Sequence, residues 1–174
     1  PSSIILDGLV SELVDYGIEI DKIFILIATG LHRISRKEEI KRIVGKNLYG
    51  KIQVIDHRAK DDETLTEIGK DEDGTPILIN SHFMESDLRI LTGYVEPHFF
   101  AGFSGGRKSI VPGIAGQEMI QKNHSAKNIA SPFARFGILE NNPIHEHSLR
   151  IAKQVNADFI VNVCINPEHN ITKV

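Results

Sequence analysis

The sequence predicts an α/β fold in which a mostly parallel sheet is flanked by helices, and two observations carry this prediction. Continuous apolar runs of strand length, such as residues 22–28 and 159–165, alternate along the chain with helical patterns. Such runs are typical of strands that are buried on both faces of a parallel sheet. The alternation of strands with helices favours the α/β class.

Local signals support the elements of the first third of the chain. Apolar residues recur at helical spacing over residues 6–14, and Gly17 follows as a stop signal. The strand at residues 22–28 leads into a polar loop. Ser35 stands three residues before Glu38, which is a capping-box pattern that predicts a helix start. A strand, a loop and a helix start make a βα unit, and loops at the carboxyl ends of such strands carry ligands in α/β folds.

The rest of the chain continues the alternation. Strands are predicted at residues 52–55, 75–80, 88–95, 159–165 and 171–174, and helices at residues 117–121 and 144–155. The charged residues 61–63 are interpreted as a solvated turn rather than a metal site. Residues 96–116 form a long irregular region, which is usually functional or disordered, and its aromatic residues argue against disorder. The sequence therefore predicts a single α/β domain over residues 1–174, with a Rossmann-like layered architecture.

Composition narrows the class of protein. The chain has 174 residues, of which 41% are hydrophobic and 25% charged, as in an ordinary soluble globular domain. With a net charge of −3, the sequence does not indicate the basic surface that is typical of nucleic-acid binding. No apolar run reaches the ~20 residues that span a bilayer. Cys164 stands alone in a strand-like run, so a buried structural thiol is expected. The lone cysteine and the lack of a basic leader at Pro1 predict a cytoplasmic location.

Residues 96–109 concentrate the groups that carry chemistry. Glycines let the backbone approach a ligand closely. His98 follows Pro97 and precedes two phenylalanines, whose apolar wall would tune the pKa of the imidazole. His32, in the loop after the strand at residues 22–28, is a second candidate acid or base. A purely structural histidine is the alternative for both.

The lysine of this loop is a candidate for covalent chemistry. Lys108 follows the run Ser104-Gly105-Gly106-Arg107, and a lysine whose pKa is lowered in an enclosed site can form covalent bonds. The run does not have the spacing of a P-loop, although glycine amides and Ser109 could hold a phosphate. A solvated surface lysine is the alternative interpretation.

The remaining histidines carry weaker signals. His124, between Asn123 and Ser125, is a candidate metal ligand. His145 and His147 lie two positions apart on a predicted helix and point to different faces, so joint metal binding by them is not expected. Three others have no supporting context in the sequence: His57, His82 and His169.

Taken together, four separated motifs resemble the nickel-dependent lactate racemase family. The motifs follow one another in order and at compatible spacing, and the resemblance covers essentially the whole chain. They are Ala28-Thr29-Gly30-Leu31-His32-Arg33, Glu96-Pro97-His98-Phe99-Phe100-Ala101-Gly102, Ser104-Gly105-Gly106-Arg107-Lys108-Ser109-Ile110-Val111-Pro112-Gly113 and Asn123-His124-Ser125.

The resemblance implies a role for each site residue. The family uses a nickel-pincer nucleotide, a pyridinium mononucleotide that grips nickel through two sulfurs and one ring carbon. Lys108 matches the lysine joined to this cofactor through a thioamide, and His124 matches the protein ligand to nickel. His32 and His98 match two acid/base histidines on opposite sides of the substrate. The cofactor pocket would include the loop residues Ser104, Gly105, Gly106 and Arg107.

The reaction implied by the resemblance is racemisation or epimerisation of a 2-hydroxy acid. The α-hydrogen leaves as hydride, giving a bound keto acid, and hydride returns to either face. This hydrogen is not acidic, so a cofactor that accepts hydride does the difficult step, while the protein orients the substrate. Imidazole nitrogen is a suitable nickel ligand, and the cofactor contributes the soft sulfurs. Two histidines are needed because the hydroxyl must exchange its proton in either of two substrate orientations.

The resemblance also implies what surrounds this chain. It would be most of the N-terminal cofactor-binding domain of a longer two-domain enzyme, without the aspartate/arginine motif that the family carries just before the position of Pro1. Expected partners are a small 2-hydroxy acid, cofactor maturation proteins and the missing second domain, with no nucleic acid and no membrane. The isolated fragment is expected to be inactive and without cofactor. Two alternatives are a nucleotide- or phosphate-binding transferase that uses no nickel, and a non-catalytic cofactor-binding domain.

Overall fold

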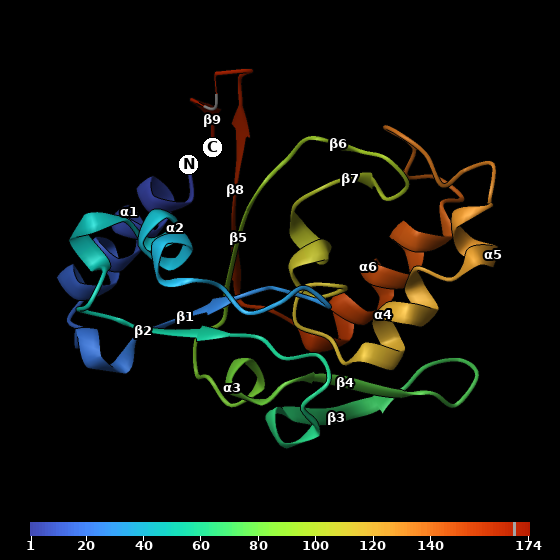
Figure 1. Cartoon of the computed structure of the whole chain (residues 1–174), viewed down its shortest axis with the longest axis horizontal. Helices are drawn as coiled ribbons and strands as arrows, with labels where there is room; N and C mark the ends of the chain where they lie inside the picture. Colours follow the sequence, from blue (N-terminus) through green and yellow to red (C-terminus); the bar gives the residue numbers. More distant parts are fainter. Residues whose placement is uncertain (169) are drawn as a thin grey trace.

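The structure is a computed structural model that describes residues 1–168 and 170–174, and Figure 1 shows how its elements are arranged. His169 lies outside the described residues. The α-helices are α1 (Ser2–Asp15), α2 (Lys37–Leu48), α3 (Ser81–Met84), α4 (Gln117–Asn123), α5 (Ala126–Ile129) and α6 (Pro143–Val155). The strands are β1 (Phe24–Ile27), β2 (Gln53–Asp56), β3 (Leu65–Lys70), β4 (Pro76–Asn80), β5 (Ile90–Tyr94), β6 (Pro97–His98), β7 (Gly102–Phe103), β8 (Phe159–Ile165) and β9 (Ile171–Lys173). In this described part, no helix is long and apolar enough to cross a membrane.

Two parallel strand pairs confirm the predicted α/β class. Strand β1 pairs with β2, with Phe24 opposite Gln53, and helix α2 makes the crossover between them. Strand β5 pairs with β8, with Ile90 opposite Phe159. Parallel strands need such long crossover connections, which is why helices separate them in the sequence.

The other pairings are antiparallel, and the described strands fall into four small sheets rather than one continuous sheet. The antiparallel pairs are β3 with β4, β6 with β7, and β8 with β9. Strand β3 is not predicted by the sequence because it contains Gly69 and charged residues, and its pairing shifts register between Glu67 and Gly69. Strands β6 and β7 have two residues each, which is too short to show any periodicity.

The helix start predicted at Ser35 lies one residue further on. Arg36 is the N-cap of α2, and its backbone N–H donates to Glu39 Oε2 at 2.7 Å. The Ser35 hydroxyl instead donates to Asp56 Oδ1 at 2.7 Å, at the end of β2. The sequence pattern predicts that Ser35 caps α2, but its side chain instead binds the Asp56 carboxylate at the end of the neighbouring strand β2.

The expectation of a buried Cys164 is wrong. The Cys164 side chain is exposed, whereas its neighbour Val163 is 1% exposed. Successive side chains of a strand point to opposite faces, so Cys164 shares a face of β8 with Ile160, which is 43% exposed. Residues 159–165 do form the predicted apolar strand, but the face that carries Ile160 and Cys164 is largely exposed to solvent.

The larger core lies directly behind the glycine-rich loop of residues 96–109. It contains the wholly buried residues Ile110, Val111 and Ala115, together with β4, α4 and α6. A second core joins α1, α2 and β1 around Val10 and Val44. Because the chain enters the larger core immediately after Lys108, the base of the loop is held by tightly packed residues.

We expect Gly113→Ala to lower the free energy of unfolding by roughly 1–3 kcal/mol, the usual cost of overpacking a filled core. A Cβ at this position would lie 2.2 Å from the Ser109 carbonyl oxygen, a backbone atom that has no room to move. Urea unfolding of the two proteins measures the difference.

Gly8→Ala is the matched control. A Cβ at Gly8 meets nothing within 4 Å, and Gly8 lies inside α1, so this change should raise stability by about 0.5–1 kcal/mol. Equal effects of the two substitutions would contradict the close packing of Gly113.

Candidate functional site

The predicted irregular region after β5 is an ordered loop whose two ends are tied together by Ser104. The Ser104 hydroxyl accepts from the Glu96 backbone N–H at 2.9 Å and donates to the Tyr94 carbonyl at 2.8 Å. The Ser104 N–H also donates to the Glu96 carbonyl at 2.8 Å. This serine therefore shapes the loop through its backbone contacts.

Arg107 holds the tip of the same loop from inside. One guanidinium nitrogen, Nη2, donates to the carbonyls of Ala101 at 2.7 Å and Phe103 at 2.9 Å. Burial lowers the pKa of Arg107. Gly105 and Gly106 precede it with φ of 72° and 53°, a conformation that favours glycine. Together these residues turn the chain so that Lys108 points back toward His98.

The side chains of His98 and Lys108 meet in this loop. His98 Nε2 lies 3.3 Å from Lys108 Nζ, and both side chains are half-buried. On the other side of the ring, His98 Nδ1 accepts from the backbone N–H groups of Ala101 at 3.2 Å and Phe100 at 3.4 Å. A nitrogen that accepts N–H bonds carries no proton, so this contact favours the tautomer protonated on Nε2. In this tautomer the uncharged form of Lys108 can accept from Nε2–H.

The pKa values of Lys108 and His98 both lie below those of the free side chains. Burial, with a smaller effect of Arg107, lowers the pKa of Lys108 to about 8. Burial and the positive charge of Lys108 lower the pKa of His98 to about 4. At neutral pH the imidazole is therefore neutral, and an appreciable fraction of the lysine is an uncharged nucleophile.

His124 joins this pair through a shared aromatic ring. The Phe100 ring packs edge-on against His98 and against His124, with centroid distances of 4.7 Å and 5.1 Å. His124 caps the end of α4, and burial followed by the charge of Lys108 lowers its pKa. Its Nδ1 is buried and has no hydrogen-bond partner among residues 1–168 and 170–174. A neutral, half-buried imidazole is the donor type that binds nickel or zinc.

His32 stands apart from the other three predicted site residues. Its side chain is exposed in the loop after β1, and within the described chain it makes no hydrogen bond to His98, Lys108 or His124. The loop itself contacts the lysine segment, because Gly30 N–H donates to the Gly113 carbonyl and Gly113 N–H donates to the Lys108 carbonyl. The structure thus brings together His98, Lys108 and His124, and places the His32 loop against the same backbone.

A buried polar network behind His124 was missed by sequence reasoning. Asn123 is wholly buried, and its amide nitrogen contacts the Ile144 carbonyl, His147 Nδ1 and Ser148 Oγ at 3.1, 2.9 and 3.2 Å. His147 Nε2 lies 2.9 Å from Asp71 Oδ2. The network fixes the end of α4 against α6, and so fixes the backbone that carries His124.

Asp71 anchors this network with three cationic or polar partners. Its side chain is 1% exposed and contacts Lys122 at 2.7 Å, Arg150 at 2.8 Å and His147. Although burial raises the pKa of this carboxyl, the hydrogen bonds from Lys122 and its neighbours hold it well below its usual range. The sequence signal was the charged segment from Asp71 to Asp73, but nothing local distinguishes it from a solvated turn.

Comparison with known proteins places this geometry in a family context. The family described as "Lactate racemase N-terminal domain" matches residues 1–137. Lactate racemase of Thermoanaerobacterium thermosaccharolyticum is 46% identical over 147 residues, which are 84% of this chain and 34% of that protein. Lactate racemase of Lactiplantibacillus plantarum is 41% identical over 150 residues, which are 86% of this chain and 35% of that protein. The chain therefore spans about a third of the length of these curated relatives.

Solved structures agree with the sequence relatives. The lactate racemase apoprotein from T. thermosaccharolyticum superimposes with a TM-score of 0.93 at 43% identity, over 99% of this chain and 41% of that chain. A protein from Thermotoga maritima superimposes with a TM-score of 0.82 at 22% identity, over 99% of this chain and 45% of that one. The second likeness concerns the fold alone.

The pKa of His98 provides a direct test of the His98–Lys108 contact. We expect the ring to stay neutral down to about pH 5, whereas an ordinary histidine is half-protonated near pH 6.5. Because the folded pKa is depressed, the unfolded chain binds more protons between about pH 4 and 6.5, and this site loses stability as the pH falls through that window. In Lys108→Met the neighbouring charge is gone but burial remains, so the pKa should rise and stay below 6.5.

Nuclear magnetic resonance titration of the ring signals measures both values. Lys127→Met, which removes an exposed lysine on α5, is the control and should leave the pKa of His98 unchanged. If the Lys108 and Lys127 variants give the same His98 pKa, the lysine does not act on this ring.

Proposed function

This chain belongs to the lactate racemase N-terminal domain family, and from that premise we propose that it is the cofactor-binding part of a racemase or epimerase of 2-hydroxy acids that uses a nickel-pincer nucleotide. The observation that carries the proposal is the 3.3 Å contact between Lys108 Nζ and His98 Nε2, with His124 packed against the same Phe100 ring as His98. A nucleophilic amine, an acid/base imidazole and a metal-binding imidazole thus converge within one loop and one helix end.

The residues present fit such a cofactor. Lys108 is half-buried and partly uncharged at neutral pH, as an amine must be to form a thioamide bond with the nucleotide. His124 would provide a protein ligand to nickel, since its Nδ1 is buried without a partner in the described chain. A Cβ at Gly106 would meet its nearest neighbour at 3.7 Å, so this glycine has space beside its backbone, whereas Gly105 packs closely, because a Cβ there would lie 3.1 Å from the Tyr94 carbonyl oxygen. Ser104 and Arg107 would shape the pocket from behind. When bound, the nickel-pincer nucleotide supplies the hydride acceptor that a non-acidic α-hydrogen requires.

The two acid/base histidines would exchange the proton of the substrate hydroxyl. His98 is neutral at physiological pH because burial and Lys108 lower its pKa, and its Nε2, which faces Lys108, is the ring nitrogen that would exchange this proton with the substrate. Its ring orientation is fixed by the N–H groups of Ala101 and Phe100. His32 lies on a different loop and would serve the enantiomer whose hydroxyl points the other way. An exposed His32 is free to reorient when substrate binds.

We expect Lys108→Ala in the full-length protein to abolish the covalent cofactor adduct, whereas His124→Ala should keep the adduct and chiefly weaken nickel retention. A thioamide has no other attachment point in this loop, but one imidazole is only one of several ligands around the metal. Intact-mass spectrometry and metal analysis, after co-expression with maturation proteins, measure the two quantities.

Lys127→Ala is the control for loss of an unrelated lysine. A normal adduct in the Lys108 variant would remove this residue from the tether role. Phosphate binding without nickel in the wild-type protein would favour a phosphate-binding transferase. A loaded protein that racemises no 2-hydroxy acid would favour a non-catalytic cofactor-binding domain.

We expect His32→Ala and His98→Ala each to reduce the initial rates from both enantiomers by about 10²–10⁴-fold, the usual contribution of a general acid or base. Each histidine acts as base for one enantiomer and as acid for the other, so neither loss can be confined to one direction. Initial rates from each pure enantiomer in the loaded full-length protein are the measurement.

His82→Ala is the matched control, because His82 is exposed on α3 and α3 packs on β3 and β4. A folded, cofactor-loaded His32 or His98 variant with normal rates from both enantiomers would disprove the assignment of two acid/base histidines.

A further inference from the structure

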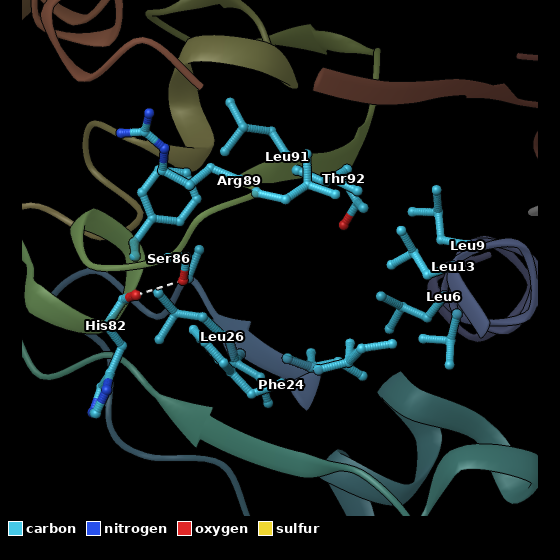
Figure 2. A pocket seen from close by; sticks show the side chains of 18 of the residues that line it. Leu6, Leu9, Leu13, Phe24, Leu26, His82, Ser86, Arg89, Leu91 and Thr92 are labelled. Carbon is cyan, nitrogen blue, oxygen red and sulfur yellow. Dashed lines mark hydrogen bonds between the residues drawn. The ribbon is translucent and has the colours of Figure 1, made fainter. Parts of the chain in front are cut away.

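Helix α4, whose C-terminal cap is His124, contacts both β4 and α6 (Figure 1). A carboxylate whose side chain is only 1% exposed, Asp71, lies in the turn between β3 and β4. It is separate from the apolar cavity of about 810 Å³ between α1, β1 and β5, whose lining includes Leu6, Leu9 and Leu13 but none of the charged groups that bind this carboxylate (Figure 2). A buried carboxylate is costly unless it is paired and hydrogen-bonded, so its partners show what it holds.

The first connection from Asp71 to α4 is direct. Lys122 Nζ contacts Asp71 Oδ2 at 2.7 Å, and Lys122 lies two residues before His124 in the chain. The same ammonium group also binds the Asp73 carboxylate, which is 59% exposed. Two carboxylates therefore hold the last turn of α4, but only that of Asp71 is buried.

The second connection runs through α6 and has one consistent arrangement of protons. The Asn123 amide nitrogen lies 3.1 Å from the Ile144 carbonyl, an acceptor that fixes which end of the amide is the nitrogen. An amide nitrogen only donates, so His147 Nδ1, at 2.9 Å from it, accepts and carries no proton. The proton of the neutral ring is then on Nε2, which donates to Asp71 Oδ2 at 2.9 Å. Asp71 thus orients His147, and His147 holds the residue next to His124.

Asn123 has a feature that stability alone does not explain. Its Oδ1 is buried and has no hydrogen-bond partner among residues 1–168 and 170–174, which costs free energy. Proteins tend to break such local rules at functional sites. The hydrogen bonds of the Asn123 amide hold the end of α4, and the ring of the next residue, His124, packs against Phe100 from there.

We propose that Asp71 is a positioning residue, which fixes the place of the His124 imidazole through both of these connections. Arg150 Nη2 contacts the other carboxylate oxygen, Oδ1, at 2.8 Å and so keeps the carboxylate oriented. Groups beyond the direct ligands of a metal commonly orient those ligands in this way. The place of the His124 ring does not depend on the proposed function, whereas its use as a nickel ligand rests on it.

Nuclear magnetic resonance of the full-length protein without cofactor, with labelled histidine and phenylalanine, tests the position of the ring. In Asp71→Asn, nuclear Overhauser contacts between the rings of His124 and Phe100 should weaken, because the variant removes the charge on which both connections depend. His98 packs against the same Phe100 ring but belongs to the loop after β5, so its contacts should persist.

Asp73→Asn is the matched control, because it removes the exposed carboxylate bound to Lys122 and leaves the buried one intact. This variant should leave the contacts of both rings unchanged. Unchanged His124 contacts in Asp71→Asn would overturn the proposal. Equal weakening of the His98 and His124 contacts would also overturn it, since that result indicates a general loosening of the fold.

Lys122→Gln keeps the test decisive if Asp71→Asn does not fold. The Lys122 side chain is 28% exposed, and this change cuts only the direct connection. Weaker contacts between His124 and Phe100, with those of His98 intact, would support the proposal. Unchanged contacts of His124 would overturn it.

Nickel retention in the loaded full-length protein separates this inference from the proposed function. If His124 is a nickel ligand, Asp71→Asn should weaken nickel retention by about 10-fold, as loss of an outer partner of a metal ligand typically does, while the adduct at Lys108 stays complete. Competition with a chelator and intact-mass spectrometry measure the two quantities. A displaced His124 ring with unchanged nickel retention would support the positioning role of Asp71 and contradict the ligand role of His124.

Discussion

The buried segment from Ile110 to Ala115 is the constraint on which the rest of the structure depends. Its backbone forms a bridge to β4 through Ala115 and Ile79, accepts a contact from His57 Nε2 at 2.9 Å, and binds the His32 loop through Gly30 and Gly113. These contacts tie strands β2 and β4 and the loop after β1 to six consecutive residues of the core. Lys108 lies two residues before this segment. The packing of the core therefore fixes the position of the Lys108 backbone more than the loop itself does. A close-packed interior tolerates little displacement, and this is how a loop can hold a reactive amine in place.

Placing the lysine at the edge of the core also sets its chemistry. Desolvation disfavours the charged form of an amine, and the neighbouring Arg107 acts in the same direction. The aromatic ring of Phe100 extends the apolar wall across to His98 and His124, so three basic groups share one poorly solvated region. Burial disfavours the protonated form of all three groups, and the positive charge of Lys108 further disfavours protonation of His98 and His124. The site therefore favours neutral nitrogen donors and nucleophiles at physiological pH, which is what metal binding and acylation of an amine both require.

What could be predicted from the sequence depended on how far apart the partners lie along the chain. The proximity of His98 and Lys108 could be anticipated because one glycine-rich loop carries both, and the continuous apolar runs correctly indicated β1 and β8. The link from Asp71 to His147 spans 76 residues and leaves no local pattern, so it could not be found. The predictions that Ser35 caps α2 and that Cys164 is buried were wrong for the same physical reason. A carboxylate on β2 competes for Ser35, and the face of β8 that carries Cys164 is uncovered; both are properties of the tertiary arrangement.

The assignment of His124 shows where local reasoning ends and the resemblance begins. On its own, a histidine at the end of a short helix is more often structural than a ligand, and only the order of the four motifs singled it out. The structure adds the local geometry that the motifs do not contain, since α6 holds Asn123 by hydrogen bonds and the neighbouring His124 ring packs against Phe100. His32 has no comparable support, because its loop is fixed at Gly30 while its ring remains exposed. Its role therefore depends on how the loops after β1 and β5, which follow strands of two separate sheets, are held relative to each other.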